Sequence, residues 1–323
     1  MSCYKHFTTK ERESLLVLLK KGQKNSEIAK ELGRSPSSIS REIRRNAATR
    51  EDYSAIRAEE QYRERRKRCV RHYKLSEPGY ARKVSELLVA YWSPEEISGR
   101  LKLEGNAIRI STCTIYRGLE NGLLNPALRK KLRIKGRTRC GGHKKSKCGQ
   151  LDIEYTIHDR PKSVESRKTI GHWEGDTVRG AKWSGCIGTQ VERVSRYAVL
   201  FKIPDRTAAS FTEANIQAFE KIPKSKRRSF TVDHGKEFSQ HRELSAKLNC
   251  KVYFADPHAP WQRGTNENFN GLLRQFFPKR TSFAEVTQSD VDAIASLLNR
   301  RPRKSLGWRS PEEVFFKKSL HLT

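Results

Sequence analysis

The chain lacks the features that mark membrane and secreted proteins. It has no apolar run near the ~20 residues that a membrane-spanning helix needs, and its N-terminus has no apolar segment typical of a signal peptide. Its seven cysteines are odd in number and scattered, which argues against a disulfide framework. A Gly-rich phosphate loop, a Ser-His-Asp arrangement and a His-Glu-x-x-His segment are also missing, so ATP use, acyl transfer and metalloproteolysis lack support. We therefore expect a cytosolic protein without a membrane partner.

Acidic side chains are few relative to basic ones. The chain has 66 Lys and Arg against 36 Asp and Glu, a formal net charge of +30. Residues 1–150 carry 36 basic and 16 acidic side chains, a net charge of +20, and residues 151–323 carry 30 and 20, a net charge of +10. This excess predicts a polyanionic partner. The first half is the expected DNA-holding region, and the second keeps its acids for another purpose.

The N-terminal segment has the pattern of a helix-turn-helix. A capped helix is predicted over 8–21, a second over 26–32, and a third from Ser35 and Pro36 onward. Short polar residues at the start of a recognition helix reach base edges, and arginines reach phosphate or guanine. An ordinary three-helix bundle is the alternative, but the turn and the basic face coincide. The predicted DNA contacts on the third helix are Ser37, Ser38, Arg41, Arg44 and Arg45.

A second unit of this kind follows. Ser93 to Glu96 combines an N-cap, a proline at the first helical position and a capping-box glutamate, with Ile97 and Leu101 facing the core. A recognition helix is expected over 111–119, after a Gly-Asn turn. Its predicted DNA contacts are Thr112, Thr114 and Arg117.

Two basic stretches flank the second unit. Residues 53–71 form a highly charged helical stretch, for which a solvated face and a phosphate contact both remain open. Residues 121–151 are rich in Lys and Arg without Asp or Glu, as in a linker that runs along the DNA backbone. Cys140, His143 and Cys148 lie within it. Structural zinc needs a fourth ligand, which is missing nearby, so a flexible basic linker is the preferred interpretation.

The sequence around three carboxylates in the second half predicts their place in a strand or a helix. Asp176 and Asp233 each end a short apolar or β-branched run, as a strand end would, and Glu267 opens an amphipathic stretch, as a helix start would. Any single carboxylate is more often a surface residue than a ligand. Three that converge from strands and a helix can hold two Mg²⁺ ions, which prefer oxygen ligands. Such a pair stabilises the attacking and leaving oxygens of a phosphoryl displacement.

Periodicity around these acids indicates a mixed α/β order. Strands are predicted over 171–178, 186–191, 197–203, 229–232 and 251–254, with a helix over 207–222 and another over 238–248. This order fits a ribonuclease-H-like sheet in which Asp176 and Asp233 lie side by side. The predicted organisation is multidomain, an all-α helix-turn-helix region followed by an α/β ribonuclease-H-like domain with a mixed five-stranded sheet. Its segments are a first helix-turn-helix domain (1–50), a charged helical connector (51–74), a second helix-turn-helix-like domain (75–122), a basic linker (123–165) and a catalytic domain (166–323).

Four segments carry a resemblance that spans nearly the whole chain. They run from Gly33 to Ile43, from Gly171 to Asp176, from Ala255 to Asn268 and from Arg301 to Gly307. With them, the chain resembles bacterial transposases of the insertion sequence 30 family, within the Asp-Asp-Glu polynucleotidyl transferases. The 33 residues between the second and third acids equal the family's spacing.

The resemblance implies both a reaction and its partners. Asp176, Asp233 and Glu267 would be catalytic and metal-binding, with two Mg²⁺ ions that Mn²⁺ can replace. Water would cleave a phosphodiester at the element's end, and the freed 3′-hydroxyl would attack target DNA. The partners would be terminal inverted repeats, target DNA and further copies of the chain, at least a dimer at synapsis. The location would be cytoplasmic and nucleoid-associated.

Residues near the acids extend this interpretation. Arg263, Arg274 and Lys279 are predicted DNA contacts, and Trp261 either contacts a flanking base or packs in the core. Glu174 and Glu237 are expected to be structural. The family usually has asparagine after its second acid, where this chain has His234; that histidine could be protonated, rotate away or hydrogen-bond the carboxylate as a supporting group. A DNA-binding regulator without catalysis and a nuclease without strand transfer remain the alternatives.

Overall fold

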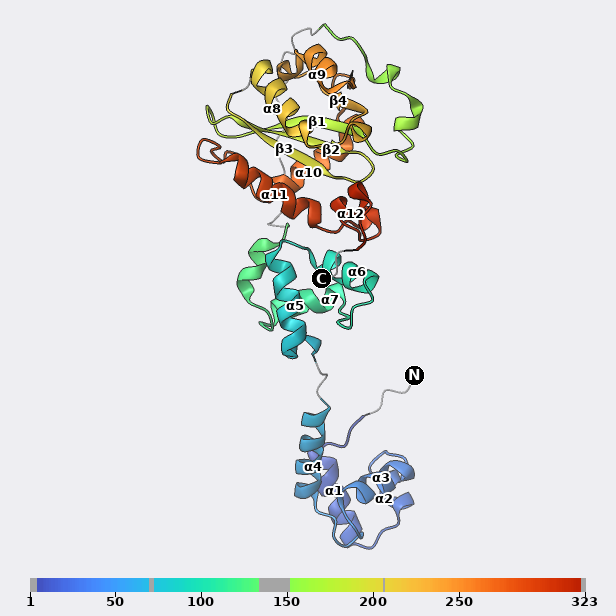
Figure 1. The fold of residues 1–323 in the computed structure, drawn as a ribbon. Coiled ribbons are helices and arrows are strands. Elements are labelled where there is room, and N and C mark those ends of the chain that lie inside the picture. Colours follow the sequence, from blue (N-terminus) through green and yellow to red (C-terminus); the bar gives the residue numbers. More distant parts are fainter. Residues whose placement is uncertain (1–4, 70–72, 134–151, 206, 321–323) are drawn as a thin grey trace. The chain divides into compact units, whose positions relative to one another are not determined.

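The computed structural model describes residues 5–69, 73–133, 152–205 and 207–320 (Figure 1). The chain divides into two compact units, Met1–Tyr73 and Lys74–Thr323. The possible zinc ligands Cys140, His143 and Cys148 lie outside the described residues, as does the central part of the predicted basic linker, residues 134–151.

The first unit is a four-helix bundle that contains the first helix-turn-helix. Its helices are α1 (Thr9–Lys20), α2 (Asn25–Glu31), α3 (Pro36–Asn46) and α4 (Ala55–Arg68). Thr8 caps α1 in a capping box with Glu11, and Ser35 caps α3 just before Pro36. These local signals explain why the three predicted helices are confirmed to within a residue or two.

The core of the first unit includes α4. Leu15, Ile28, Ile39 and Ala58 are fully or almost fully buried. The guanidinium of Arg12 is buried beside them, where it pairs with Glu42 of α3 at 2.8 Å and Glu59 of α4 at 2.6 Å. The charged helix that follows the first helix-turn-helix is therefore part of its bundle.

The second unit begins with another helical bundle, made of α5 (Pro78–Val89), α6 (Pro94–Leu103) and α7 (Thr112–Glu120). The predicted capping box of Ser93 and Glu96 begins α6, and Ile97 and Leu101 are fully buried as predicted. Helix α5 was not anticipated from the sequence.

A mixed five-stranded sheet follows, as predicted. The strands are β1 (His172–Arg179), β2 (Cys186–Glu192), β3 (Ala198–Ile203), β4 (Ser229–Val232) and β5 (Lys251–Phe254). Their order is β3-β2-β1-β4-β5. The pairs β1–β2 and β2–β3 are antiparallel, whereas β1–β4 and β4–β5 are parallel.

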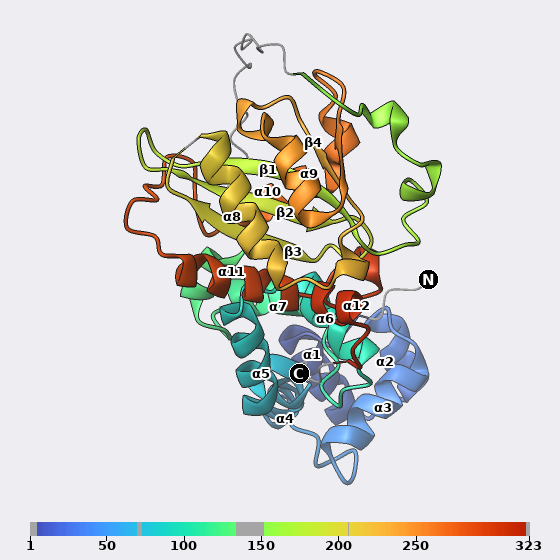
Figure 2. The ribbon, with the colours of Figure 1, turned by 45° about the horizontal axis from the view of Figure 1, so that its top comes forward.

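Helices cover both faces of the sheet (Figure 2). One face packs on α8 (Ala208–Glu220) and α9 (His241–Leu248) around an aromatic core with Trp173 at its centre. The other face packs on α10 (Gly264–Leu273) and α11 (Gln288–Arg300) through a core that includes Phe269 and Val291. Helix α12 (Pro311–Phe316) adds Phe315 to the first core. The result is the three-layer arrangement expected of a ribonuclease-H-like domain.

Two identical tetrapeptides join the second helix-turn-helix to this layered domain. Ser-Pro-Glu-Glu begins α6 at Ser93 and α12 at Ser310, and each forms a capping box. The glutamate of each box binds an arginine from the other side. Glu313 accepts from Arg100 of α6 at 2.6 and 2.8 Å, and Glu96 accepts from Arg301 at 2.8 Å.

Candidate active site

The pairing of β1 with β4 places the first two predicted acids. Asp176 lies inside β1, opposite Thr189 of β2, and Asp233 directly follows β4. The expectation that Asp176 ends its strand is wrong, because β2 pairs with β1 as far as Arg179. Glu174 of β1 pairs with Thr231 of β4, and the two strands are parallel. Asp176 and Asp233 each lie two residues further along, so they lie opposite each other.

A guanidinium joins the two aspartates. Arg263 Nη2 lies 2.8 Å from Asp233 Oδ2, and its Nη1 lies 3.7 Å from Asp176 Oδ1. Nη1 also donates to the carbonyl of Gly175 at 2.9 Å. The carboxylates thus converge on one cation, which confirms that they lie side by side.

The surroundings of Asp176 raise the pKa of its carboxyl group. Burial raises its pKa to about 6, and the nearby charges of Asp233 and Glu237 act in the same direction, while Arg263 opposes them. Its Oδ1 accepts from the backbone of Thr177, and its Oδ2 accepts from Asn270 Nδ2, both at 2.8 Å. Sequence reasoning missed Asn270, although it follows Glu267 by three residues and so shares a helix face with it.

The third predicted acid is apart from this pair. Glu267 is in the first turn of α10 and is exposed. Among the residues that the structure describes, no group of three or more His, Cys, Asp and Glu is placed to hold a metal ion. The structure therefore brings Asp176 and Asp233 together but does not bring Glu267 to them. In the sequence, Glu267 follows the bridging Arg263 by four residues.

Glu174 fixes the start of the helix that carries Glu267. It is fully buried, and its Oε2 accepts from the backbone N–H groups of Thr265 and Asn266 at 2.8 and 3.0 Å. Its Oε1 lies 3.4 Å from Arg193 Nε. A carboxylate at a helix N-terminus satisfies otherwise unpaired N–H groups and complements the helix dipole. The structural role expected for Glu174 is confirmed, and it anchors α10 to β1.

Other residues near the acids have definite contacts. His234 turns to the carbonyl of Ala255, to which its Nε2 donates at 2.7 Å. Glu237 is buried and accepts from Thr177 Oγ1 at 2.7 Å. The interpretation that Trp261 packs in the core is wrong, because its side chain is 74% exposed.

The predicted DNA contacts have differing surroundings. Arg274 donates to the carbonyl of Arg179 at 3.0 Å, which links the end of α10 to the end of β1, and Lys279 is exposed. On α7, Arg117 is exposed while Thr112 and Thr114 are partly buried. On α3, Ser38 is partly buried and the exposed positions are Ser37, Arg41, Arg44 and Arg45.

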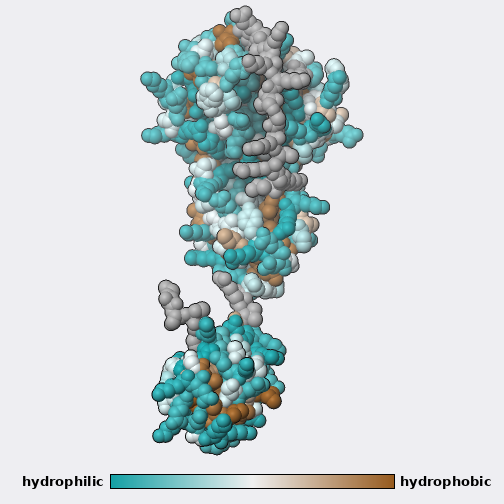
Figure 3. Space-filling view, turned by 180° about the vertical axis from the view of Figure 1, so that it is seen from behind, coloured by the Kyte–Doolittle hydropathy of each residue, from teal (hydrophilic) through white to brown (hydrophobic). Residues whose placement is uncertain are grey.

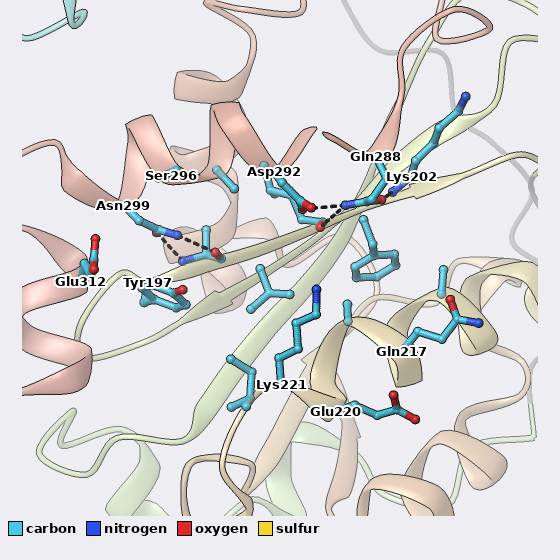
Figure 4. A pocket seen from close by; sticks show the side chains of 18 of the residues that line it. Tyr197, Lys202, Gln217, Glu220, Lys221, Gln288, Asp292, Ser296, Asn299 and Glu312 are labelled. Atoms are coloured by element: carbon cyan, nitrogen blue, oxygen red, sulfur yellow. Dashed lines mark hydrogen bonds between the residues drawn. The ribbon is translucent and has the colours of Figure 1, made fainter. Parts of the chain in front are cut away.

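A cavity at the edge of the sheet contains none of the candidate residues. Hydrophilic side chains cover most of the face seen in Figure 3. A cavity of about 660 Å³ runs along the edge strand β3 between α8 and α11 (Figure 4). Asn299 and Gln288 of α11 hydrogen-bond the outward backbone groups of β3 there. None of the predicted site residues lines this cavity.

Comparison with known families gives the class of protein. A family model described as a helix-turn-helix domain matches residues 3–46, and one described as an integrase core domain matches residues 166–260. The second match contains Asp176 and Asp233 and ends before Glu267. The chain is thus a helix-turn-helix protein with an integrase core, a fold of polynucleotidyl transferases.

Relatives narrow this class to a family. The chain is 39% identical over 322 residues to the transposase InsI for insertion sequence element IS30C of Escherichia coli (strain K12), covering 96% of this chain and 83% of the relative. It is 41% identical over 298 residues to the transposase for IS1086 of Cupriavidus metallidurans, covering 89% and 87%. It is 34% identical over 313 residues to the transposase for IS4351 of Bacteroides fragilis, covering 96% and 95%. The chain belongs to the IS30 family of transposases.

Two further properties follow at a coarse level. An integrase core implies dependence on a divalent metal ion, and a helix-turn-helix implies binding to DNA. No helix within the described ranges is long and apolar enough to cross a membrane.

Proposed function

We propose that the protein is a DNA transposase that binds the terminal inverted repeats of an insertion sequence. It cleaves phosphodiester bonds at the ends of the element and joins the freed 3′-hydroxyls to target DNA. Asp176, Asp233 and Glu267 are the catalytic acids. The observation that carries this proposal is the convergence of Asp176 and Asp233 on a single cation, at the place where two parallel strands lie side by side.

The acids suit a divalent metal by their chemistry. Carboxylate oxygens are the ligands that Mg²⁺ prefers, and those of Asp176 and Asp233 already share one positive charge. Two Mg²⁺ ions, or Mn²⁺ in their place, would stabilise the attacking and leaving oxygens of each displacement. Asp176 and Asp233 would hold them, and Glu267 would complete the ligand set.

The neighbouring residues orient these acids. Asn270 fixes one oxygen of Asp176, and the backbone N–H of Thr177 fixes the other, which is the oxygen nearer to Arg263. Glu174 holds the N-terminus of α10 against β1, which sets the position of Glu267 relative to the aspartates. His234 supports the loop after Asp233 through Ala255, so it acts on the acid indirectly.

DNA is held by the basic surfaces of both helix-turn-helix units. Arginines of α3 and Arg117 of α7 are exposed and reach phosphates or bases from a recognition helix. Lys279 and Arg274 add phosphate contacts nearer the acids. The proposed assembly is a homo-oligomer, at least a dimer, on paired element ends, associated with the nucleoid.

The decisive experiment compares the wild-type protein with Glu267→Gln on a labelled duplex of the element's end. With Mg²⁺, the wild type should nick at the end, and Glu267→Gln should bind equally well without cutting. Added target plasmid should then acquire the labelled end, which a simple nuclease would never transfer. Equal binding without cleavage by either protein, in Mg²⁺ or Mn²⁺, would indicate a DNA-binding regulator, and His234→Asn would then be tested for recovery of activity.

A further inference from the structure

The place between the two aspartates is taken by a side chain of the protein itself. Arg263 is partly buried, and its guanidinium reaches both Asp233 at 2.8 Å and Asp176 at 3.7 Å. Two neighbouring carboxylates repel each other unless a positive charge lies near them. Arg263 supplies that charge from within the chain.

The arginine is not fully satisfied in this position. Its Nε is buried and has no hydrogen-bond partner among the described residues. A buried donor without a partner is unfavourable. Arg263 is therefore held mainly by the two carboxylates and the Gly175 carbonyl, as expected of a side chain that can be exchanged.

Arg263 also occupies a particular place relative to the third acid. It directly precedes α10, and Glu267 lies four residues later in the first turn of that helix. The basic side chain points to the aspartates, while the acidic one is exposed.

We propose that Arg263 is an internal substitute for the metal ion. In the metal-free protein its guanidinium neutralises Asp176 and Asp233 and blocks the site, and it must leave them before a divalent cation binds. Glu267, in the first turn of the helix that Arg263 directly precedes, then turns to the aspartates in its place. This inference rests on the proposed function, because it assumes that these acids bind metal.

The exchange links metal binding to DNA binding. A guanidinium displaced from two carboxylates needs another anionic partner. A DNA phosphate at the same site can accept two parallel hydrogen bonds from it. Metal ions and DNA should therefore favour each other's binding through Arg263. The metal-free protein, with its acids neutralised, is held in an inactive state.

The first test measures Mn²⁺ binding by the full-length protein without DNA, by calorimetry. Arg263→Gln should bind Mn²⁺ about 10-fold more tightly than the wild type, within the usual range of such couplings. Arg274→Gln removes an equal charge from the opposite end of α10, where Arg274 makes no ion pair with either aspartate, and its Mn²⁺ affinity should stay near that of the wild type. Equal Mn²⁺ affinity of Arg263→Gln and the wild type would overturn the proposal, and so would an equal gain in Arg274→Gln.

The second test needs no metal and checks that the variant is folded. Arg263→Gln should lower the Tm of the metal-free protein, because the aspartates lose their counter-charge. In an Asp233→Asn background this loss of Tm should largely disappear. An undiminished loss in that background would mean that Arg263 supports the fold through other contacts, against the proposal.

The two proposals fail in different ways. If Glu267→Gln is inactive on DNA but Mn²⁺ affinity is the same with and without Arg263, only the role of Arg263 is overturned. If Mn²⁺ binds neither the wild type nor Arg263→Gln, and Glu267→Gln still cleaves, the assignment of the acids itself is wrong.

Discussion

The two helix-turn-helix units begin a helix with the same capping motif, but the glutamates of these motifs pair with arginines from different parts of the chain. The first opens α1 with a capping box of Thr8 and Glu11, and the second opens α6 with one of Ser93 and Glu96. Glu11 also pairs with Arg34, inside its own unit, at 2.8 Å. Glu96 pairs with Arg301, from the segment that follows α11, at 2.8 Å.

A buried arginine shows the same contrast. Arg12 is paired with Glu42 and Glu59, both within the first unit. Arg100 is paired with Glu104 of its own helix region and with Glu313, 213 residues further along the chain. The first unit is thus closed on itself, whereas the second is built into the catalytic unit. We conclude that the second helix-turn-helix is tied to the catalytic domain through α6, within one compact unit.

The largest expected effect comes from removing the two buried arginines in turn. Arg12→Ala and Arg100→Ala should each lower the free energy of unfolding of their unit by about 3–5 kcal/mol, because each removes an arginine that pairs with a buried carboxylate, Glu42 in the first unit and Glu313 in the second. Hydrogen exchange followed by mass spectrometry should show lost protection only in α1 to α4 for Arg12→Ala. For Arg100→Ala the loss should include α12 as well as α6. Full protection of α12 in that variant would contradict the comparison.

A smaller effect is expected from a methyl group at the contact of α6 with the catalytic domain. A Cβ at Gly99 would lie 2.3 Å from the indole of Trp308, so Gly99→Ala should destabilise by about 1–3 kcal/mol through overpacking. Gly79→Ala is the matched control, because a Cβ there meets nothing within 4 Å. All five tryptophans lie in the second unit, so denaturant unfolding followed by tryptophan fluorescence reports on it alone. Equal midpoints for the two variants would show that the Trp308 side chain can move away from the added methyl group without a cost in stability.

The smallest effect concerns pH and the first unit. Burial raises the pKa of Glu11, but hydrogen bonds from Thr8 and Arg34 outweigh it and leave the pKa below its ordinary value of 4.5. A carboxyl whose pKa is lowered by folding stabilises the fold above its unfolded pKa, and this contribution is lost as pH falls through the folded pKa. Glu11→Gln should therefore cost about 0.5 kcal/mol at pH 7 and close to nothing near pH 2. A cost that is equal at both pH values would assign the effect to the cap alone.

Local signals explain how much of this architecture the sequence predicts. Capping residues and β-branched runs lie next to the elements they define, so the helices around Ser35 and Ser93 and the five strands were predictable. The Ser-Pro-Glu-Glu segment at Ser310 carries the same signal as the one at Ser93, so α12 could have been found by the same rule.

The missed features depend on contacts between distant segments. The bridge from Arg263 to Asp176 and Asp233 depends on how α10 meets the sheet, and no spacing rule reports that. Likewise, Glu174 and Asp176 are two residues apart in one strand, yet one caps a helix and the other faces the candidate metal site. The pairing of Arg100 with Glu313 was hidden for the same reason.

The side-chain amides of α11 have a consequence for assembly. Asn299 both donates to and accepts from the backbone of Ala198. Gln288 donates to the carbonyl of Leu200 and accepts from the N–H of Lys202, so these two amides imitate a neighbouring strand. An open sheet edge would invite strand-to-strand joining between copies that crowd together on DNA, which is a route to aggregation. With the β3 edge covered in this way, copies that meet on one DNA molecule are protected from joining through that edge of the sheet.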